Sequence, residues 1–171
     1  MKALRSGAAA LLFLAILHGC ATLGSLGAVI QPPSFQVDQT QQAQLRLLGP
    51  GPGRPLGGAA VRLYARVRNP NPLGLTLSTV AGGLLLEGQQ AAQVNFPLGV
   101  PLTAGQETVV PLDIGISFSE IPALAGVLTR AVTGSPIRYR LDGTVGINAG
   151  LLGQPTFGPM TLLQGDLRVT R

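Results

Sequence analysis

Apolar and polar residues alternate with a period of two over most of this chain, and this pattern limits its fold more than any other feature. The segment 61–68 alternates without a break: Val61, Leu63, Ala65 and Val67 are apolar, and Arg62, Tyr64, Arg66 and Arg68 are polar. Successive side chains of a β-strand point to opposite faces of the sheet. The alternation therefore predicts strands with one face in the core and the other in water.

Shorter or less regular runs of the same kind lie on both sides of this segment. They cover residues 35–38, 45–47, 75–77, 84–86, 94–98, 109–116, 137–147 and 163–169. Residues 49–58 hold five glycines and three prolines, which predicts a loop there. Pro111 cannot donate a backbone hydrogen bond, so its strand is expected at a sheet edge or at a bulge.

One segment has a helical period instead. Its apolar positions follow the i, i+3, i+4, i+7 spacing of an amphipathic helix and are Ile121, Leu124, Ala125 and Leu128. Ser119 is suited to cap the start of this helix, Pro122 is tolerated in its first turn, and Gly134 is suited to end it. With a helix over residues 118–132 between late strands, the chain is predicted to form an all-β, two-layer antiparallel sandwich of about seven strands.

The first 20 residues have the composition of an export signal. Lys2 and Arg5 precede an apolar run over residues 7–17. That run is too short to span a membrane as a helix, which needs about 20 residues, and has the length of a signal-peptide core. Residues 17–20 (LHGC) resemble the bacterial lipobox, in which a leucine and a small residue precede an acylated cysteine. His18 departs from the small residue that is usual at its position.

Cys20 is therefore the predicted lipid attachment site. Two or three acyl chains on this cysteine would anchor the chain stably to a membrane. Ala21, in place of aspartate, fits sorting to the outer membrane, with the protein on its periplasmic face, if the host has one. The predicted organisation is a lipoprotein signal peptide over residues 1–19, a tether over 20–33 and one β-domain over 34–171.

Histidine and cysteine are scarce in this chain, and this limits the catalytic and metal-binding roles that it can have. His18 is the only histidine and Cys20 the only cysteine. After signal removal and acylation, no histidine remains for general-base or metal chemistry, and no thiol for a disulfide or a zinc site. The acidic residues Asp113, Glu120, Asp142 and Asp166 fall in separate segments with no shared spacing. We expect no metal, no cofactor and no small-molecule substrate, and an enzyme is the least favoured class.

The arginines form one candidate surface. Arg62, Arg66 and Arg68 share one strand face, and Arg138 and Arg140 share another. If these strands are neighbours, the five arginines form a cationic patch for anionic lipid headgroups or phosphates. The favoured alternative is a solvated outer sheet face. Nucleic acid is not an expected partner, because the arginines form no cluster rich in lysine or aromatic residues.

A second candidate is the run Asn69, Pro70, Asn71 and Pro72, which ends the most regular strand. Each proline fixes φ and biases the preceding asparagine away from helical conformation. Asparagine side chains can bond nearby backbone groups and replace lost ladder partners. The two asparagines could bind a ligand, but capping a sharp turn is the favoured interpretation.

This motif opens a series that resembles the water stress and hypersensitive response (WHy) domain, also called the late embryogenesis abundant type-2 family. In that family a hydrophobic strand runs into Asn-Pro-Asn, a strand ending at a glycine turn follows, and a helix precedes two closing strands. In order, the matching segments here are 61–71, 84–88, 101–116, 117–133 and 137–169. The resemblance spans about residues 35–169, and the loop over 49–58 departs from it.

The resemblance implies an immunoglobulin-like or fibronectin III-like β-sandwich with a short helix, and a role in tolerance to desiccation or osmotic stress. A composition of 46% hydrophobic and 11% charged residues agrees with a folded rather than a disordered chain. We expect a lipid-anchored, non-catalytic protein that protects membrane or client proteins through weak contacts during water loss. The alternative is an envelope adaptor or scaffold that binds a protein partner through an exposed strand edge.

Overall fold

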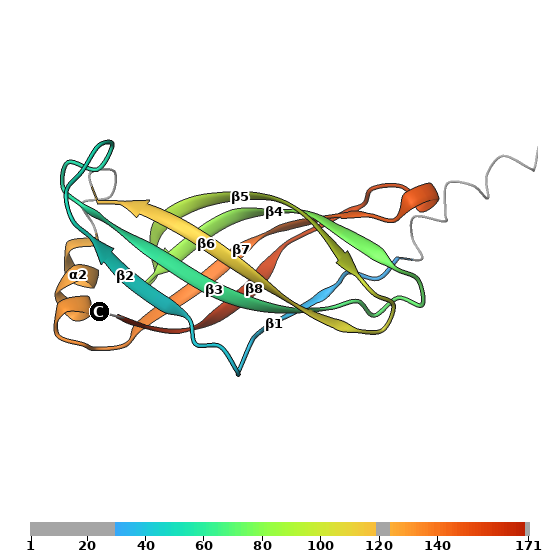
Figure 1. The fold of residues 1–171 in the computed structure, drawn as a ribbon, viewed down its shortest axis with the longest axis horizontal. Helices are drawn as coiled ribbons and strands as arrows, with labels where there is room; N and C mark the ends of the chain where they lie inside the picture. The colour runs from blue at the N-terminus through green and yellow to red at the C-terminus, as the bar shows by residue number, and fades with distance from the viewer. Residues whose placement is uncertain (1–29, 119–123, 170–171) are drawn as a thin grey trace, which may run out of the picture. The chain divides into compact units, whose positions relative to one another are not determined.

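The computed structural model describes residues 30–118 and 124–169 (Figure 1). The predicted lipid site Cys20 and the predicted helix start at Ser119, Ile121 and Pro122 lie outside these residues. Among the described residues, no helix combines the length and the apolar character that crossing a membrane requires. The β-rich part of the chain belongs to one compact unit over Pro32–Arg171.

Strands make up most of this unit, as the alternation predicts. In chain order the elements are β1 (Ser34–Val37), β2 (Gln44–Leu48), β3 (Gly58–Arg68), β4 (Leu75–Leu86), β5 (Gln89–Leu102), β6 (Glu107–Ser117), helix α2 (Ala125–Val132), β7 (Ile137–Asn148), the 3₁₀-helix η3 (Gly150–Leu152) and β8 (Thr156–Val169). The all-β prediction is confirmed.

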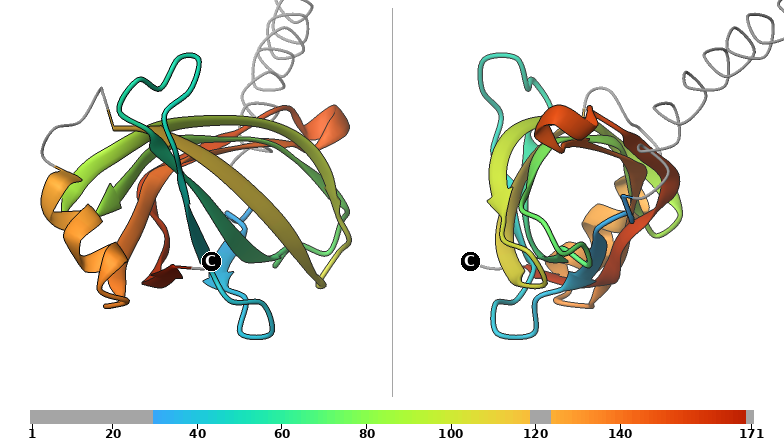
Figure 2. Two further views of the ribbon diagram at one scale, coloured as in Figure 1. Left: turned by 60° about the vertical axis from the view of Figure 1, so that its left-hand side comes forward. Right: turned by 90° about the vertical axis from the view of Figure 1, so that its right-hand side faces the viewer.

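The strands form two half-sheets that join at one seam. In one half, β3 pairs with β1 and β2 along one edge and with β6 along the other. In the other half, the order is β8-β7-β4-β5. The seam is a short parallel pairing of β2 with β8, at Gln44↔Arg168 and Leu45↔Val169, and all other pairings are antiparallel. The half-sheets curl toward each other, so that their apolar faces enclose the core (Figure 2).

The buried faces are those that the alternation predicts. On β3 the apolar positions Val61, Leu63, Ala65 and Val67 are all 0–1% exposed. The largest completely buried side chains come from both half-sheets and include Leu63, Leu77, Leu84, Leu112, Leu141 and Leu167. Pro111 lies on β6, whose described partner is β3 alone, so this proline is on an edge strand, as predicted.

Helix α2 covers one end of the core. Leu124, Val127 and Ala131 are buried and line the same small apolar space as Leu45 and Leu86. The helix ends as predicted: Gly134 has φ +75°, and the N–H of Ser135 donates to the carbonyl of Arg130 at 3.1 Å. This left-handed glycine closes the last turn at little steric cost. The loop before β3 also follows the prediction, although Gly58 already belongs to the strand.

β4 and β7 approach each other closely at a pair of glycines. Gly82 on β4 lies opposite Gly143 on β7. A Cβ on Gly143 would overlap the carbonyl oxygen of Ala81, and a Cβ on Gly82 would overlap that of Asp142. The missing side chains therefore allow these two long strands to stay paired at this point.

We predict that Gly143→Ala lowers the free energy of unfolding by about 1–3 kcal/mol, because the backbones must separate to admit the methyl group. Gly115→Ala is the matched control, since Gly115 is also inside a strand but has no atom within 4 Å of an added Cβ. Urea denaturation of both variants measures the difference. Equal stability of the two variants would contradict the close-approach explanation.

Candidate functional site

The Asn-Pro-Asn turn is held by one buried amide. Asn69 is 0% exposed, and its Nδ2 donates to the carbonyls of Leu73 at 2.8 Å and of Leu102 at 3.1 Å. Its Oδ1 accepts from both the backbone N–H and the Nδ2 of Asn71, each at 3.0 Å. Both donors and both acceptor positions of the Asn69 amide are thus used. The amide ties the end of β3 to the end of β5.

The rest of this turn offers little for binding. Asn71 is 3% exposed, and Pro70 and Pro72 lie on the surface. The backbone N–H of Asn69 donates to the carbonyl of Gln106 in the β5–β6 turn at 3.0 Å. The buried amide groups therefore join three chain segments, and this geometry is that of a structural turn.

The five candidate arginines do not lie on neighbouring strands. Arg62, Arg66 and Arg68 lie on β3, which is flanked by β1, β2 and β6. Arg138 and Arg140 lie on β7, which is flanked by β4 and β8 in the other half-sheet. The prediction of a joint surface depended on neighbouring strands, and periodicity does not reveal which strands pair.

Four of these arginines also have acidic partners. Arg62 pairs with Asp113, and Arg66 pairs with Asp38 at 2.9 Å and Glu107 at 3.6 Å. On the other half-sheet, Arg138 pairs with Glu87 at 3.4 Å and Arg140 with Asp142 at 2.8 Å. The outer faces therefore carry mostly matched charges, which weakens their attraction for an anionic surface.

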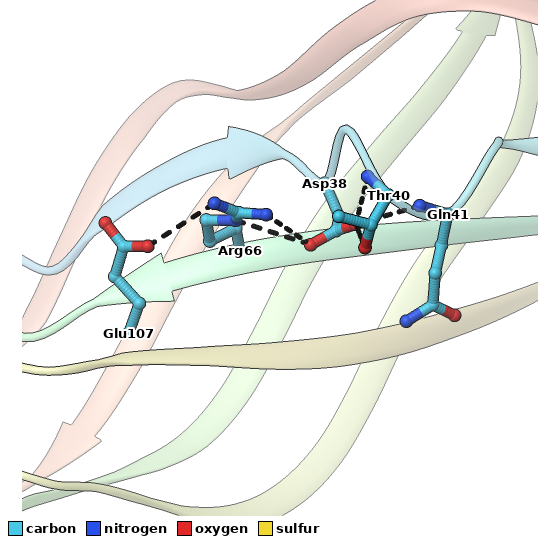
Figure 3. Close-up of polar contacts among 5 residues, drawn as sticks. All are labelled: Asp38, Thr40, Gln41, Arg66 and Glu107. Atoms are coloured by element: carbon cyan, nitrogen blue, oxygen red, sulfur yellow. Dashed lines mark hydrogen bonds and ion pairs between the residues drawn. The ribbon is translucent and has the colours of Figure 1, made fainter.

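Asp38 is the most constrained charged group on this face (Figure 3). It is 2% exposed. Its Oδ1 accepts from the hydroxyl and the backbone N–H of Thr40 and from the N–H of Gln41, and its Oδ2 accepts from Nη2 of Arg66 at 2.9 Å. The Thr40 hydroxyl, and next to it the Arg66 guanidinium, hold the pKa of Asp38 well below its usual range. Asp38 thus fixes the β1–β2 loop and is no proton donor at neutral pH.

Glu87 forms a second anchored carboxylate that the sequence analysis did not single out. It sits with φ +48° beside Gly88 at φ +80°, in the two-residue turn between β4 and β5. Its Oε1 accepts the backbone N–H of Arg138 at 2.8 Å, and its Oε2 lies 3.9 Å from Arg130 of α2. The hydrogen bond from the backbone N–H of Arg138 is the main reason why the pKa of Glu87 is lowered. The hairpin tip is thereby tied to β7 and to the helix.

Tyr139 carries a buried polar group without a described partner. The side chain is on the inward face of β7 and is 4% exposed, and its hydroxyl has no hydrogen-bond partner among the described residues. Burial, and next to it the charge of Asp166, raises the pKa of Tyr139 to about 12. Alternation correctly predicts a buried ring here, but it carries no information about what the hydroxyl meets.

Binding of a metal ion would require a suitable grouping of side chains among the described residues. Within residues 30–118 and 124–169, no three His, Cys, Asp or Glu side chains are grouped so that they could hold a metal ion. The carboxylates described above are instead used in turns and ion pairs.

Comparison with known proteins identifies relatives of this fold. A family model described as late embryogenesis abundant protein matches residues 64–161. The solution structure of an Arabidopsis thaliana protein is 17% identical with a TM-score of 0.59, and the match covers 84% of this chain and 86% of that one. A second solution structure, assigned to the late embryogenesis abundant (LEA) proteins, is 20% identical with a TM-score of 0.53 and coverages of 94% and 82%. Comparison with curated proteins gives no match.

We predict that Asn69→Ala lowers the free energy of unfolding by at least about 2 kcal/mol, because it leaves buried carbonyl and amide groups without partners. Asn95→Ala is the control, since Asn95 is exposed on β5. Thermal unfolding of both variants measures the effect. A loss in Asn69→Ala no larger than that in Asn95→Ala would refute the structural role of the turn.

The Asp38 network predicts a dependence of stability on pH. A carboxyl group with a lowered pKa stabilises the fold above its ordinary pKa of 3.8, and this contribution is lost as the pH falls below that value. Asp38→Asn should therefore unfold at a lower temperature than wild type at pH 7. This gap in unfolding temperature between the two proteins should become smaller as the pH falls below about 4. Asp113→Asn, which removes an exposed ion pair, should give a smaller gap at pH 7. A gap that stays constant down to pH 2 would contradict this assignment.

Proposed function

Because the chain belongs to the late embryogenesis abundant protein family, we propose that it is a non-catalytic stress-protection protein, held at the cell envelope by a lipid on Cys20. The family match carries this proposal, since residues 64–161 run from β3 into β8 and include most of the sandwich. Under desiccation or osmotic stress, the domain would protect membrane or client proteins. It would do so through weak contacts made by its outer faces.

The charge arrangement supports weak rather than tight contacts. Arg62 on β3 and Arg140 on β7 are exposed and are matched by carboxylates at hydrogen-bond distance. Such a surface remains well hydrated and presents no large field of one sign. Exposed ion pairs of this kind contribute about 0–1 kcal/mol each, so they can exchange partners at low cost. A protein that separates crowded surfaces without binding one of them strongly needs this property.

The proposed anchor sets where the domain acts. Residues 17–20 carry the lipobox-like sequence, and a tether over residues 20–33 would lead to the β-domain. Fully extended, this tether would span at most about 50 Å, at 3.3–3.6 Å per residue. The domain would therefore work within that distance of the membrane surface.

A specific feature of β5 and β6 favours the alternative of an envelope adaptor. The described partner of β5 is β4 alone and that of β6 is β3 alone, so each strand has an open edge. A hollow of about 490 Å³ separates residues 90–93 of β5 from residues 115–117 of β6. An extended partner segment could add to either edge by backbone hydrogen bonds. Pro97 and Pro111 remove donors from these edges and limit such pairing.

We predict that cells lacking the gene lose viability and leak periplasmic content more than wild type after controlled drying. Complementation with the wild-type gene should restore survival, and Cys20→Ala should restore less, because the domain would no longer be held at the membrane. Ser25→Ala, in the same segment, is the control and should restore survival fully. Equal survival and leakage with and without the gene would overturn the stress role. Capture of one stoichiometric protein partner would favour the adaptor.

A further inference from the structure

Three turns lie together at one end of the β-domain (Figure 1). They join β3 to β4, β5 to β6 and β7 to β8. Thr76 near the start of β4 is opposite Asn148 at the end of β7, which places the β7–β8 turn beside the β3–β4 turn. The N–H of Asn69 donates to the carbonyl of Gln106 at 3.0 Å and joins the β3–β4 turn to the β5–β6 turn. We call this part of the domain the three-turn end.

The β-domain also begins at the three-turn end. Ser34, the first residue of β1, is opposite Arg68, the last residue of β3. A tether over residues 20–33 would therefore join the domain beside the β3–β4 turn. If Cys20 carries lipid, this is the end that the anchor draws toward the membrane.

The turns of the three-turn end carry no charge. Three long stretches of the sequence contain no Lys, Arg, His, Asp or Glu, and they are residues 69–86, 88–106 and 143–165. Together they include all three turns. By contrast, the β4–β5 turn, at the other end of the same half-sheet, holds Glu87 and its arginine partners. Removing a charged group from water is costly, so an uncharged end can approach lipid more easily than a charged one.

The β7–β8 tip, residues 149–153, presents two leucines at this end. Leu151 is completely exposed, and Leu152 beside it is half-buried. Both belong to the 3₁₀-helix η3, in which no residue is buried. A single exposed leucine is ordinary on a protein surface. Here it stands among uncharged turns, at the end where the proposed tether joins the domain, and this combination indicates a membrane contact.

The backbone of the tip is already hydrogen-bonded within the tip itself. The N–H of Gly150 donates to Oδ1 of Asn148 at 2.8 Å, and the N–H of Ala149 donates to the carbonyl of Gly153 at 2.9 Å. The N–H groups of Leu152 and Gly153 donate to the carbonyls of Ala149 and Gly150. Backbone groups that are paired inside the protein lose little when water is removed, whereas unpaired ones resist entry into lipid. The tip can therefore leave water without unfolding.

We propose that the β7–β8 tip inserts Leu151 and Leu152 into the headgroup region of the bilayer that holds the anchor, so that the domain stands on its three-turn end. This inference rests on the proposed lipid at Cys20, because two leucines alone bury too little apolar surface for stable membrane binding. The tether raises the effective concentration of the tip at the bilayer, so a weak contact is sufficient. The contact would give the domain one orientation, with the loop over residues 49–58 directed away from the membrane.

Tryptophan fluorescence tests this contact, because the chain has no tryptophan of its own. Leu151→Trp and Leu56→Trp are made in the full chain, isolated from membranes and placed in phosphatidylcholine vesicles with or without bromine on the acyl chains. Leu56 is the matched control: it is 70% exposed and lies just before β3, at the opposite end of that strand from the three-turn end. Brominated lipid should lower the emission of Leu151→Trp by about half or more and leave that of Leu56→Trp unchanged.

A second reporter separates insertion of the leucine from mere nearness to the anchor. Thr103→Trp places the fluorophore on the β5–β6 turn, where Thr103 is exposed. Adding Leu151→Asp should reduce the quenching of this reporter by about half or more, because a carboxylate opposes entry of the tip into lipid. Adding Leu56→Asp instead should leave the quenching unchanged. Equal quenching in the two double variants would overturn the proposal.

Flotation of the vesicles, recorded in parallel, distinguishes the tip contact from the anchor. Protein that floats with the vesicles while brominated lipid does not quench Leu151→Trp would overturn the tip contact and leave the anchor in place. A blue-shifted emission of Leu151→Trp without quenching would place the tip against protein, such as a second copy of this chain, and would also overturn it. Protein that does not float would overturn the anchor and the tip contact together.

Discussion

The burial of one face of every long strand is the constraint on which the rest of this structure depends. Since side chains alternate between faces, fixing Val61, Leu63 and Val67 in the core also fixes Arg62, Arg66 and Arg68 on the outside. The register of β3 against β6 then places Arg62 opposite Asp113 and brings Glu107 within 3.6 Å of Arg66. The charge pairing of the outer face is therefore a consequence of how the core is packed.

At the ends of strands, backbone N–H and C=O groups no longer have partners in the sheet, although they still lie close to the core. These groups need other hydrogen-bond partners. At the end of β3, the buried amide of Asn69 donates to the backbone carbonyl of Leu73. At the β4–β5 turn, the carboxylate of Glu87 accepts a hydrogen bond from the backbone N–H of Arg138. Asp38 does the same after β1. In each case a polar side chain joins segments far apart in the sequence, so these residues support the fold rather than a reaction.

The sequence was most informative where alternation is regular and least informative where contacts are tertiary. β3 and β7 were predicted with the correct faces, because their residues alternate almost without exception. β4 was predicted only at its two ends, since residues 78–83 lack the pattern; Gly82 is there because β7 approaches closely. The parallel contact of β2 with β8 and the separation of the arginines depend on strand order, which periodicity does not encode. Alternation accounts for the buried ring of Tyr139, but it does not show that the hydroxyl lacks a hydrogen-bond partner among the described residues.

These features together describe a folded member of the late embryogenesis abundant family whose polar residues mostly serve its own architecture. Its proposed action then depends on where the domain is held. The most direct test is the intact mass of the protein isolated from the envelope of its host. The account predicts a chain that begins at Cys20 and carries the mass of two or three acyl chains. A chain that begins at another residue, or one that begins at Cys20 without added lipid, would contradict envelope anchoring and the mode of protection proposed from it.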